Sequence, residues 1–153
     1  FTGNDWLVLK PLIPDVAIAI VSAADEEGNA WISGPKWDNL EQVRASQRTI
    51  VLAHEIISTE TIRQYPDKTV IPGYDVSHVV HLPFAAHPTS VHGSYDYDAE
   101  GIKYYANAAL TPETFKGYLD EFVFGVPDHA TYLEKVGGKT MLDAIKADPK
   151  LGY

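Results

Sequence analysis

Histidine, hydroxyl and carboxylate side chains are concentrated between residues 82 and 98 of this chain of 153 residues. The stretch reads Leu82-Pro83-Phe84-Ala85-Ala86-His87-Pro88-Thr89-Ser90-Val91-His92-Gly93-Ser94-Tyr95-Asp96-Tyr97-Asp98. It follows an apolar run, and loops beyond the carboxyl ends of strands often carry ligand sites because the sheet behind them is rigid. We therefore expect a binding site here, with His87, Ser90, Tyr95 and Asp96 as its candidate residues.

His87 has a restricted backbone, because the residue before a proline is confined to extended conformations. A neighbour such as Ser90 or Asp96 could hold its ring for a functional role. The alternative is a structural histidine whose two ring nitrogens fix the loop. A Ser-His-Asp hydrolase site built from Ser90, His87 and Asp96 is disfavoured, since the G-x-S-x-G elbow of such hydrolases is absent.

Four histidines lie close together in the sequence and raise the question of a zinc or iron site: His78, His81, His87 and His92. Their spacing matches neither the HExxH nor the facial-triad pattern, and on a strand His78 and His81 would point to opposite faces. The chain contains no cysteine, which excludes thiolate ligands, disulfides and a thiol nucleophile. We therefore expect no metal site.

Glu55 follows an apolar strand, where its carboxylate could act as a nucleophile or a base. The alternation of aromatic and acidic residues at 95–98 favours an interface over a substrate contact. Neither the G-x-G-x-x-G motif nor the Walker lysine motif is present, so nucleotide hydrolysis is unsupported.

The charge balance limits the partners of the chain. With 21 acidic and 12 basic side chains the formal net charge is -9, which disfavours nucleic acids and anionic membranes because both are bound mainly through Lys and Arg. No apolar run approaches the ~18 residues of a membrane span, and no secretory leader is recognisable. The chain begins at Phe1 and its single methionine is Met141, so we expect the natural start to lie upstream.

Two apolar runs predict the strands that position the 82–98 stretch. Residues 16–21 and 49–53 show no polar alternation, as expected for strands covered on both faces. Asp38 is placed to cap a helix between them, which predicts a parallel strand-helix-strand unit. A turn at 26–29 leads into a short strand at 30–33.

Helix and strand signals continue to the end of the chain. A helix begins at Ser58 or Thr59 and ends near Pro66, and strands follow at 69–72 and 76–82. A helix around Ile102, Tyr105 and Ala106 comes next.

The most regular helix begins at the Thr111 cap, ends near Gly125 and presents one apolar face, made of Phe115, Tyr118, Leu119, Phe122 and Val123. Another helix runs from Asp128 to Gly137, before a last amphipathic turn at 141–145. The economical fold is a single α/β domain over residues 1–153, with an open, mostly parallel sheet and flanking helices.

The stretch from Pro83 to Asp98 resembles part of the A (alpha) subunits of family I coenzyme A transferases, in particular the glutaconate CoA-transferases. In that family a Pro, an aromatic residue and Ala-His-Pro-Ser/Thr lead into Gly-x-Tyr-Asp-Tyr-Asp. Further fragments follow the family's order: Pro14-Asp15-Val16-Ala17-Ile18, Asp25 to Asn29, Glu55-Ile56-Ile57-Ser58, Ile71-Pro72-Gly73, Asp128-His129, Tyr132-Leu133 and Leu151-Gly152-Tyr153. The sequence departs from the family at His54, where Glu is usual, and at Ala85, where Gly is usual.

The resemblance implies an open α/β fold of the coenzyme A transferase type, and it implies that the chain is the C-terminal part of an alpha subunit whose N-terminal half is absent. The implied reaction moves CoA between an acyl-CoA and a carboxylic acid, glutaconate or a related acid. A glutamate of the B (beta) subunit would form the glutamyl-CoA thioester. No residue of this chain is then the nucleophile, and Glu55 orients loops or caps the next helix.

The resemblance further implies a cytoplasmic hetero-oligomer, inactive as this chain alone, with CoA as a substrate and no covalently bound cofactor. Its substrate- or CoA-proximal residues would be His87, Ser90, Tyr95, Asp96 and Glu55. Two alternatives stay open. Relatives of these transferases include hydrolases and decarboxylases of CoA thioesters, and the departures at His54 and Ala85 keep that activity in view. A non-catalytic assembly module that binds another subunit is the second alternative.

Overall fold

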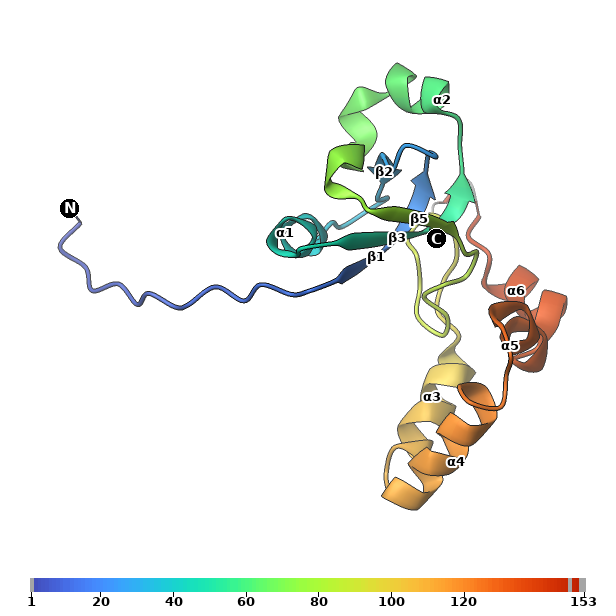
Figure 1. Cartoon of the computed structure of the whole chain (residues 1–153). Coiled ribbons are helices and arrows are strands. Elements are labelled where there is room, and N and C mark those ends of the chain that lie inside the picture. Colours follow the sequence, from blue (N-terminus) through green and yellow to red (C-terminus); the bar gives the residue numbers. More distant parts are fainter. Residues whose placement is uncertain (1, 149, 152–153) are drawn as a thin grey trace.

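A five-stranded sheet forms the centre of the computed structural model, which describes residues 2–148 and 150–151 (Figure 1). Its strand order is β4-β2-β1-β3-β5. The strands are β1 (Ala17–Ala24), β2 (Ala30–Trp31), β3 (Thr49–Ile56), β4 (Thr69–Ile71) and β5 (His78–His81). β3 is parallel to β1 and to β5, whereas β2 is antiparallel to β1 and to β4. The predicted α/β class with a mostly parallel sheet is confirmed.

The predicted strand-helix-strand unit consists of β1, α1 (Asn39–Ala45) and β3. Val43 of α1 packs on one face of the sheet, where Ala19, Val21 and Val51 form part of the main apolar core. The prediction that both faces are covered holds for this face only, because Ile18 on the opposite face of β1 is exposed.

Both central strands end three residues beyond the apolar runs that predicted them. β1 continues to Ala24 and β3 to Ile56, because the parallel ladder extends through the pairs Ala23↔Glu55 and Ala24↔Ile56. The polar side chain of Glu55 does not end the strand, since backbone hydrogen bonds rather than side-chain hydrophobicity carry the ladder.

The predicted turn at 26–29 is built around a buried carboxylate. Asp25 Oδ1 accepts hydrogen bonds from the backbone N–H groups of Glu27 and Asn29 at 3.1 and 2.8 Å. Gly28 has a φ of 91°, and a Cβ atom there would lie 2.9 Å from Val76 Cβ. The turn leads into β2, which ends at Trp31 rather than at the predicted residue 33.

Three of the described helices begin where the sequence predicts, near Ser58, Thr111 and Asp128. Ser58, Thr111 and Asp128 each accept a hydrogen bond from the backbone N–H of the residue three positions later. The predicted cap at Asp38 is wrong. Asp38 precedes α1 with φ -100° and ψ 15°, outside the extended conformation that capping needs, and its carboxylate accepts from Gln42 Nε2 instead.

The remaining helices follow β3. They are α2 (Thr59–Gln64), α3 (Ala99–Ala108), α4 (Pro112–Phe122), α5 (His129–Lys135) and α6 (Gly138–Ile145). The 3-10 turns η1 (Pro66–Lys68) and η2 (Gly73–Asp75) flank β4, so β4 and β5 are shorter than the predicted strands. α3 and α4 form a hairpin that projects from the sheet (Figure 1).

α4 ends at Phe122 instead of near Gly125, and its apolar side chains are half-buried against α3 rather than against the sheet. Of the final fragment that resembles the family, Gly152 and Tyr153 lie outside the described residues.

Candidate functional site

The motif loop, residues 82–98, connects the carboxyl end of β5 to the start of α3 (Figure 1). Tyr95 anchors it in the interior. The Tyr95 side chain is 1% exposed, and its hydroxyl accepts a hydrogen bond from the Ala86 N–H at 2.8 Å. Its ring lies 4.7 Å from that of Phe84 and 5.2 Å from that of His54 of β3, measured between centroids. Tyr95 therefore fastens the loop to the sheet.

His54 supports the loop from the end of β3. Its Nδ1 accepts a hydrogen bond from the Phe84 N–H at 3.2 Å, so that nitrogen carries no proton. Burial lowers the pKa of His54, while the charge of Glu55 opposes this. Phe84 has a φ of 59°, a left-handed conformation that is unfavourable for an aromatic residue. The contact from His54 helps to maintain it.

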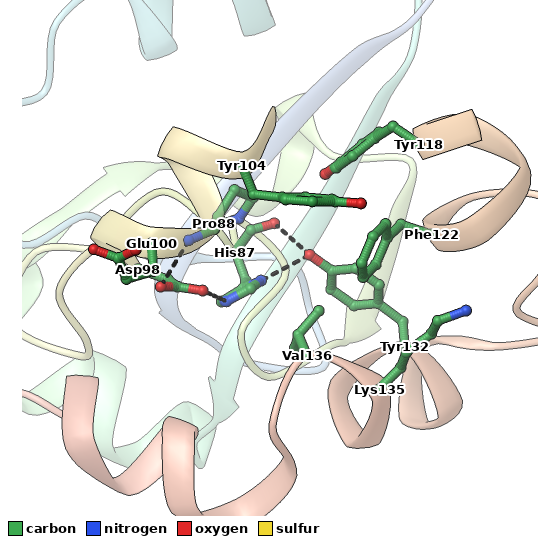
Figure 2. A pocket seen from close by; sticks show the side chains of 11 residues that line it. His87, Pro88, Asp98, Glu100, Tyr104, Tyr118, Phe122, Tyr132, Lys135 and Val136 are labelled. Carbon is green, nitrogen blue, oxygen red and sulfur yellow. Dashed lines mark hydrogen bonds and ion pairs between the residues drawn. The ribbon is translucent and has the colours of Figure 1, made fainter. Parts of the chain in front are cut away.

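The side chain of His87 points from the motif loop into the interior, between two elements that are distant in the sequence. Its side chain is 1% exposed. Nδ1 lies 2.7 Å from the Tyr132 hydroxyl of α5, and Nε2 lies 3.3 Å from Asp98 Oδ2 at the start of α3 (Figure 2). The second contact is close enough for an ion pair but is not aligned as a hydrogen bond. We call these three residues the clamp.

Protonation in the clamp follows from burial and charge. Burial lowers the pKa of His87, and the Asp98 carboxylate opposes this only in part. A neutral imidazole with its proton on Nε2 faces the carboxylate and accepts at Nδ1 from the Tyr132 hydroxyl. Burial also raises the pKa of Tyr132 to about 12, so the phenol keeps its proton. The clamp therefore joins the motif loop, α3 and α5 through hydrogen bonds and charge.

A pocket of about 290 Å³ lies beside the clamp, between the motif loop, α3, α4 and α5 (Figure 2). Four aromatic side chains line it: Tyr104, Tyr118, Phe122 and Tyr132. Lys135 is also in the lining, but its ammonium group donates to the Glu121 carbonyl at 2.9 Å and lies 3.7 Å from Glu121 Oε1. This wall suits an apolar or aromatic group better than the phosphates of CoA.

The predicted site residues do not converge on one point. Ser90 lines a separate hollow of about 340 Å³, together with His92 and with Ile20 and Ser22 of β1. Asp96 is exposed, and its carboxylate accepts a hydrogen bond from the Tyr97 N–H. The structure thus places Ser90 and Asp96 at the surface and Tyr95 beneath it.

Glu55 lies inside β3 rather than beyond its end, and its side chain is exposed. Its backbone is paired with Ala23 of β1. Its role near a substrate stays a prediction, as does that of the motif-loop residues.

The predicted holders of the His87 ring are wrong. The structure puts Asp98 and Tyr132 beside it, in place of Ser90 and Asp96, and the Ser90-His87-Asp96 triad does not form. One ring nitrogen, Nδ1, ties His87 to Tyr132, while Nε2 faces Asp98 without an aligned hydrogen bond. A substrate-proximal role for His87 stays a prediction.

Sequence reasoning missed Asp98 and Tyr132 as partners of His87. Asp98 could have been found as the cap of α3, where its Oδ1 accepts the Gly101 N–H. Tyr132 has no local signal, because it lies 45 residues from His87 and reaches it only through the packing of α5.

The four clustered histidines do not assemble a metal centre. Within residues 2–148 and 150–151, no group of three or more His, Asp or Glu side chains is arranged to hold a metal ion. None of the described helices has both the length and the hydrophobicity of a membrane span.

Comparisons with known proteins agree with this architecture. Residues 1–82 match the sequence profile of the coenzyme A transferase family. The chain is 40% identical to the A (alpha) subunit of glutaconate CoA-transferase from Acidaminococcus fermentans, over 100% of this chain and 48% of the relative. The crystal structure of glutaconate coenzyme A-transferase from the same organism superposes with a TM-score of 0.86 and 42% identity, over 91% of this chain and 44% of the other.

A crystal structure of the decarboxylase AibA/AibB is also similar, with a TM-score of 0.58 and 30% identity over 71% of this chain and 40% of the other. The chain spans about half the length of the curated relatives it matches. The profile match covers more than half of the chain and includes all five strands of the sheet. The chain belongs to the coenzyme A transferase family.

Proposed function

We propose that this chain is the C-terminal half of the alpha subunit of a cytoplasmic, hetero-oligomeric CoA-transferase. The enzyme moves CoA between an acyl-CoA and glutaconate or a related carboxylic acid. Its beta subunit supplies the glutamate that carries CoA as a thioester, and CoA enters only as a substrate. The 40% identity to the alpha subunit of a glutaconate CoA-transferase over the full chain carries this proposal.

The chemistry of the chain supports a role without a nucleophile. The imidazoles of His54 and His87 are engaged by the loop and by the clamp. Glu55 is exposed on a strand, and none of the ion pairs between described residues holds its carboxylate in a fixed position. Covalent exchange through a carboxylate needs an accessible glutamate held against the thioester, and a partner subunit is the source that fits.

The motif loop is the part of this chain that we place next to the substrates. Ser90, Asp96 and Glu55 are exposed, whereas Tyr95 and His87 hold the loop from below. Ser90 and His92 share one hollow, where a hydroxyl and an imidazole can donate to a carboxylate or a thioester oxygen. Tyr95 and His87 would then position the loop, and the other three residues would contact the substrates.

The test follows the transfer of CoA from one carboxylic acid to another that carries a label. The assembled alpha and beta subunits should transfer CoA from acetyl-CoA to labelled glutaconate, and the beta subunit should gain the mass of CoA during turnover. The chain alone should show neither. Turnover by the purified chain without a beta subunit would overturn the assignment.

A decarboxylase on the same fold is the second candidate, because AibA/AibB is similar over 71% of the chain and is named a decarboxylase. Hydrolysis of a CoA thioester is tested alongside it. If the assembled enzyme forms no labelled glutaconyl-CoA, release of carbon dioxide would identify a decarboxylase and release of free CoA would identify a hydrolase. A complex that forms normally but processes no thioester would instead identify a non-catalytic assembly module.

A further inference from the structure

The strand register places five apolar side chains on one face of the sheet. Ile18 is paired with Ile50, Ile20 with Leu52, and Leu52 with Val80. Paired residues of parallel strands point to the same side, so these residues form an apolar surface over β1, β3 and β5, bordered by His78, which is paired with Ile50. We call it the open face.

The open face lacks the cover that α1 provides on the other side of the sheet. Ile18 is 63% and Val80 40% exposed, whereas Val21 and Val51 on the α1 side are fully buried. Parallel sheets are normally covered on both faces, because their strands carry few polar side chains that could face water. Ile20, Ile50 and Leu52 are half-buried, and Ile20 shares a hollow with Ser90 of the motif loop, so the described residues cover this face only in part.

A second exposed apolar segment leads into the same strand. The N-terminal arm, residues 2–16, runs away from the body of the molecule (Figure 1). Its apolar side chains from Trp6 to Leu9 are each at least 75% exposed. Near the end of the arm, Gln47 donates from its backbone N–H to the Pro14 carbonyl and from Nε2 to Asp15 Oδ1. Apolar surface of this extent normally marks a contact site.

The strand order indicates what could complete the sheet. β5 is an edge strand, so its outer backbone groups are available to pair with an added strand, while helices following that strand would lie across the open face. The relatives contain roughly as much chain again as the part matched here. A second copy of this chain fits less well, because each copy carries a net charge of -9 and the two would repel.

We propose that the open face and the N-terminal arm together form the docking surface for the other half of the alpha subunit. This inference rests on the proposed function, which identifies the chain as one half of such a subunit. The occupant is an α/β unit with an apolar helical face toward Ile18 and Ile50, and its chain or a neighbouring loop covers the arm.

The test supplies the missing half as a separate polypeptide. The probe is the part of the alpha subunit of Acidaminococcus fermentans glutaconate CoA-transferase that lies outside the matched region, titrated against this chain by calorimetry. Ile18→Glu puts a charge on the open face, and Leu9→Glu puts one on the arm. Leu110→Glu, at the equally exposed tip of the α3–α4 hairpin, is the matched control.

The probe should bind this chain and the control with the same affinity. Ile18→Glu and Leu9→Glu should each weaken binding on the order of tenfold or more, because a carboxylate would be buried without a partner. Leu9 lies on the arm outside the folded body, so Leu9→Glu remains informative even if Ile18→Glu unfolds the chain. Hydrogen exchange should slow on β5 and on the arm when the probe binds.

Unchanged binding in both variants would overturn the inference, as would the absence of any binding. So would protection of the open face by a second copy or by the isolated beta subunit. The CoA-exchange assay is read separately. Docking without CoA exchange would support this inference and contradict the proposed activity. CoA exchange by an assembled enzyme in which neither substitution has an effect would support the activity and contradict this inference.

Discussion

At the scale of single residues, the clamp explains how a loop rich in polar side chains keeps one conformation. Tyr132 and Asp98 contact opposite sides of the His87 ring, and the ring is almost fully shielded from water. A buried polar atom that loses its partner costs free energy, so each contact in the clamp stabilises the loop more than an exposed one would.

Replacing Tyr132 by Phe should destabilise the protein by about 1–3 kcal/mol, because His87 Nδ1 would be left buried without a donor. Chemical denaturation of the variant measures this change in the free energy of unfolding. Tyr97→Phe, at a position 53% exposed, is the control and should have little effect. Equal losses in the two variants would show that the Tyr132 hydroxyl does not support the loop.

Stability should fall with acid in a way that depends on His87. The pKa values of His54 and His87 are lowered in the folded state from the ordinary 6.5, so below about pH 6.5 the unfolded chain binds more protons than the folded one. This contribution is complete above pH 6.5 and is lost as the pH falls. Melting temperatures between pH 8 and 5 measure it.

His87→Gln should flatten this pH dependence, whereas Tyr132→Phe, which retains the imidazole, should preserve it. A slope that is unchanged in His87→Gln would assign the acid sensitivity to other groups.

At the scale of elements, local backbone chemistry decides where each element begins and turns. Thr111 starts α4 with a side-chain cap and a following proline, and Gly28 permits the turn between β1 and β2. Such positions depend on conformations that few residue types adopt without strain, so their substitutions have a predictable sign.

Two glycines should respond to alanine in opposite directions. Gly28→Ala should destabilise the protein by about 1–3 kcal/mol, because φ is positive and the new Cβ would meet Val76. Gly117→Ala, inside α4 with no atom within 4 Å of the new Cβ, should stabilise it by about 0.5–1 kcal/mol. Thermal unfolding measures the stability change in both variants. A change in the same direction in both would contradict the turn geometry.

Thr111→Ala should weaken the start of α4 by about 0.5–2 kcal/mol through loss of the hydrogen bond from the Thr114 N–H. Denaturant unfolding measures the loss. Thr140→Ala, at an exposed position in α6, controls for removal of a threonine hydroxyl and should change stability little.

At the scale of the whole molecule, the chain combines one well-packed side of the sheet with exposed apolar surfaces. The α1 side of the sheet is packed, while the open face and the arm expose apolar side chains. The motif loop borders the hollow formed by Ser90 and β1, so that hollow lies at the boundary between packed and unpacked parts.

Ser90→Ala in the assembled enzyme should lower kcat/KM for CoA transfer about two- to tenfold, the effect of losing one hydrogen bond from an exposed hydroxyl. Steady-state kinetics with acetyl-CoA and glutaconate measures it, and Thr140→Ala, which removes an exposed hydroxyl outside the motif loop, is the matched control. Normal kinetics in Ser90→Ala would remove this residue from the proposed contact set.

The sequence by itself determined the α/β class, the β1-α1-β3 unit, the starts of three helices and the location of the motif loop. These features depend on neighbours along the chain: apolar runs, capping hydroxyls and carboxylates, and glycines that tolerate positive φ. The same local logic failed at Asp38, where the backbone preceding the helix is not extended.

Only the tertiary structure decided that His87 meets Tyr132 and Asp98, that Tyr95 is buried, and that one face of the sheet stays open. Contacts across 45 residues depend on the path of α3, α4 and α5, which no local pattern records. The open face likewise depends on which elements reach the sheet, because an apolar strand has the same sequence whether its second face is covered within the chain or by further polypeptide.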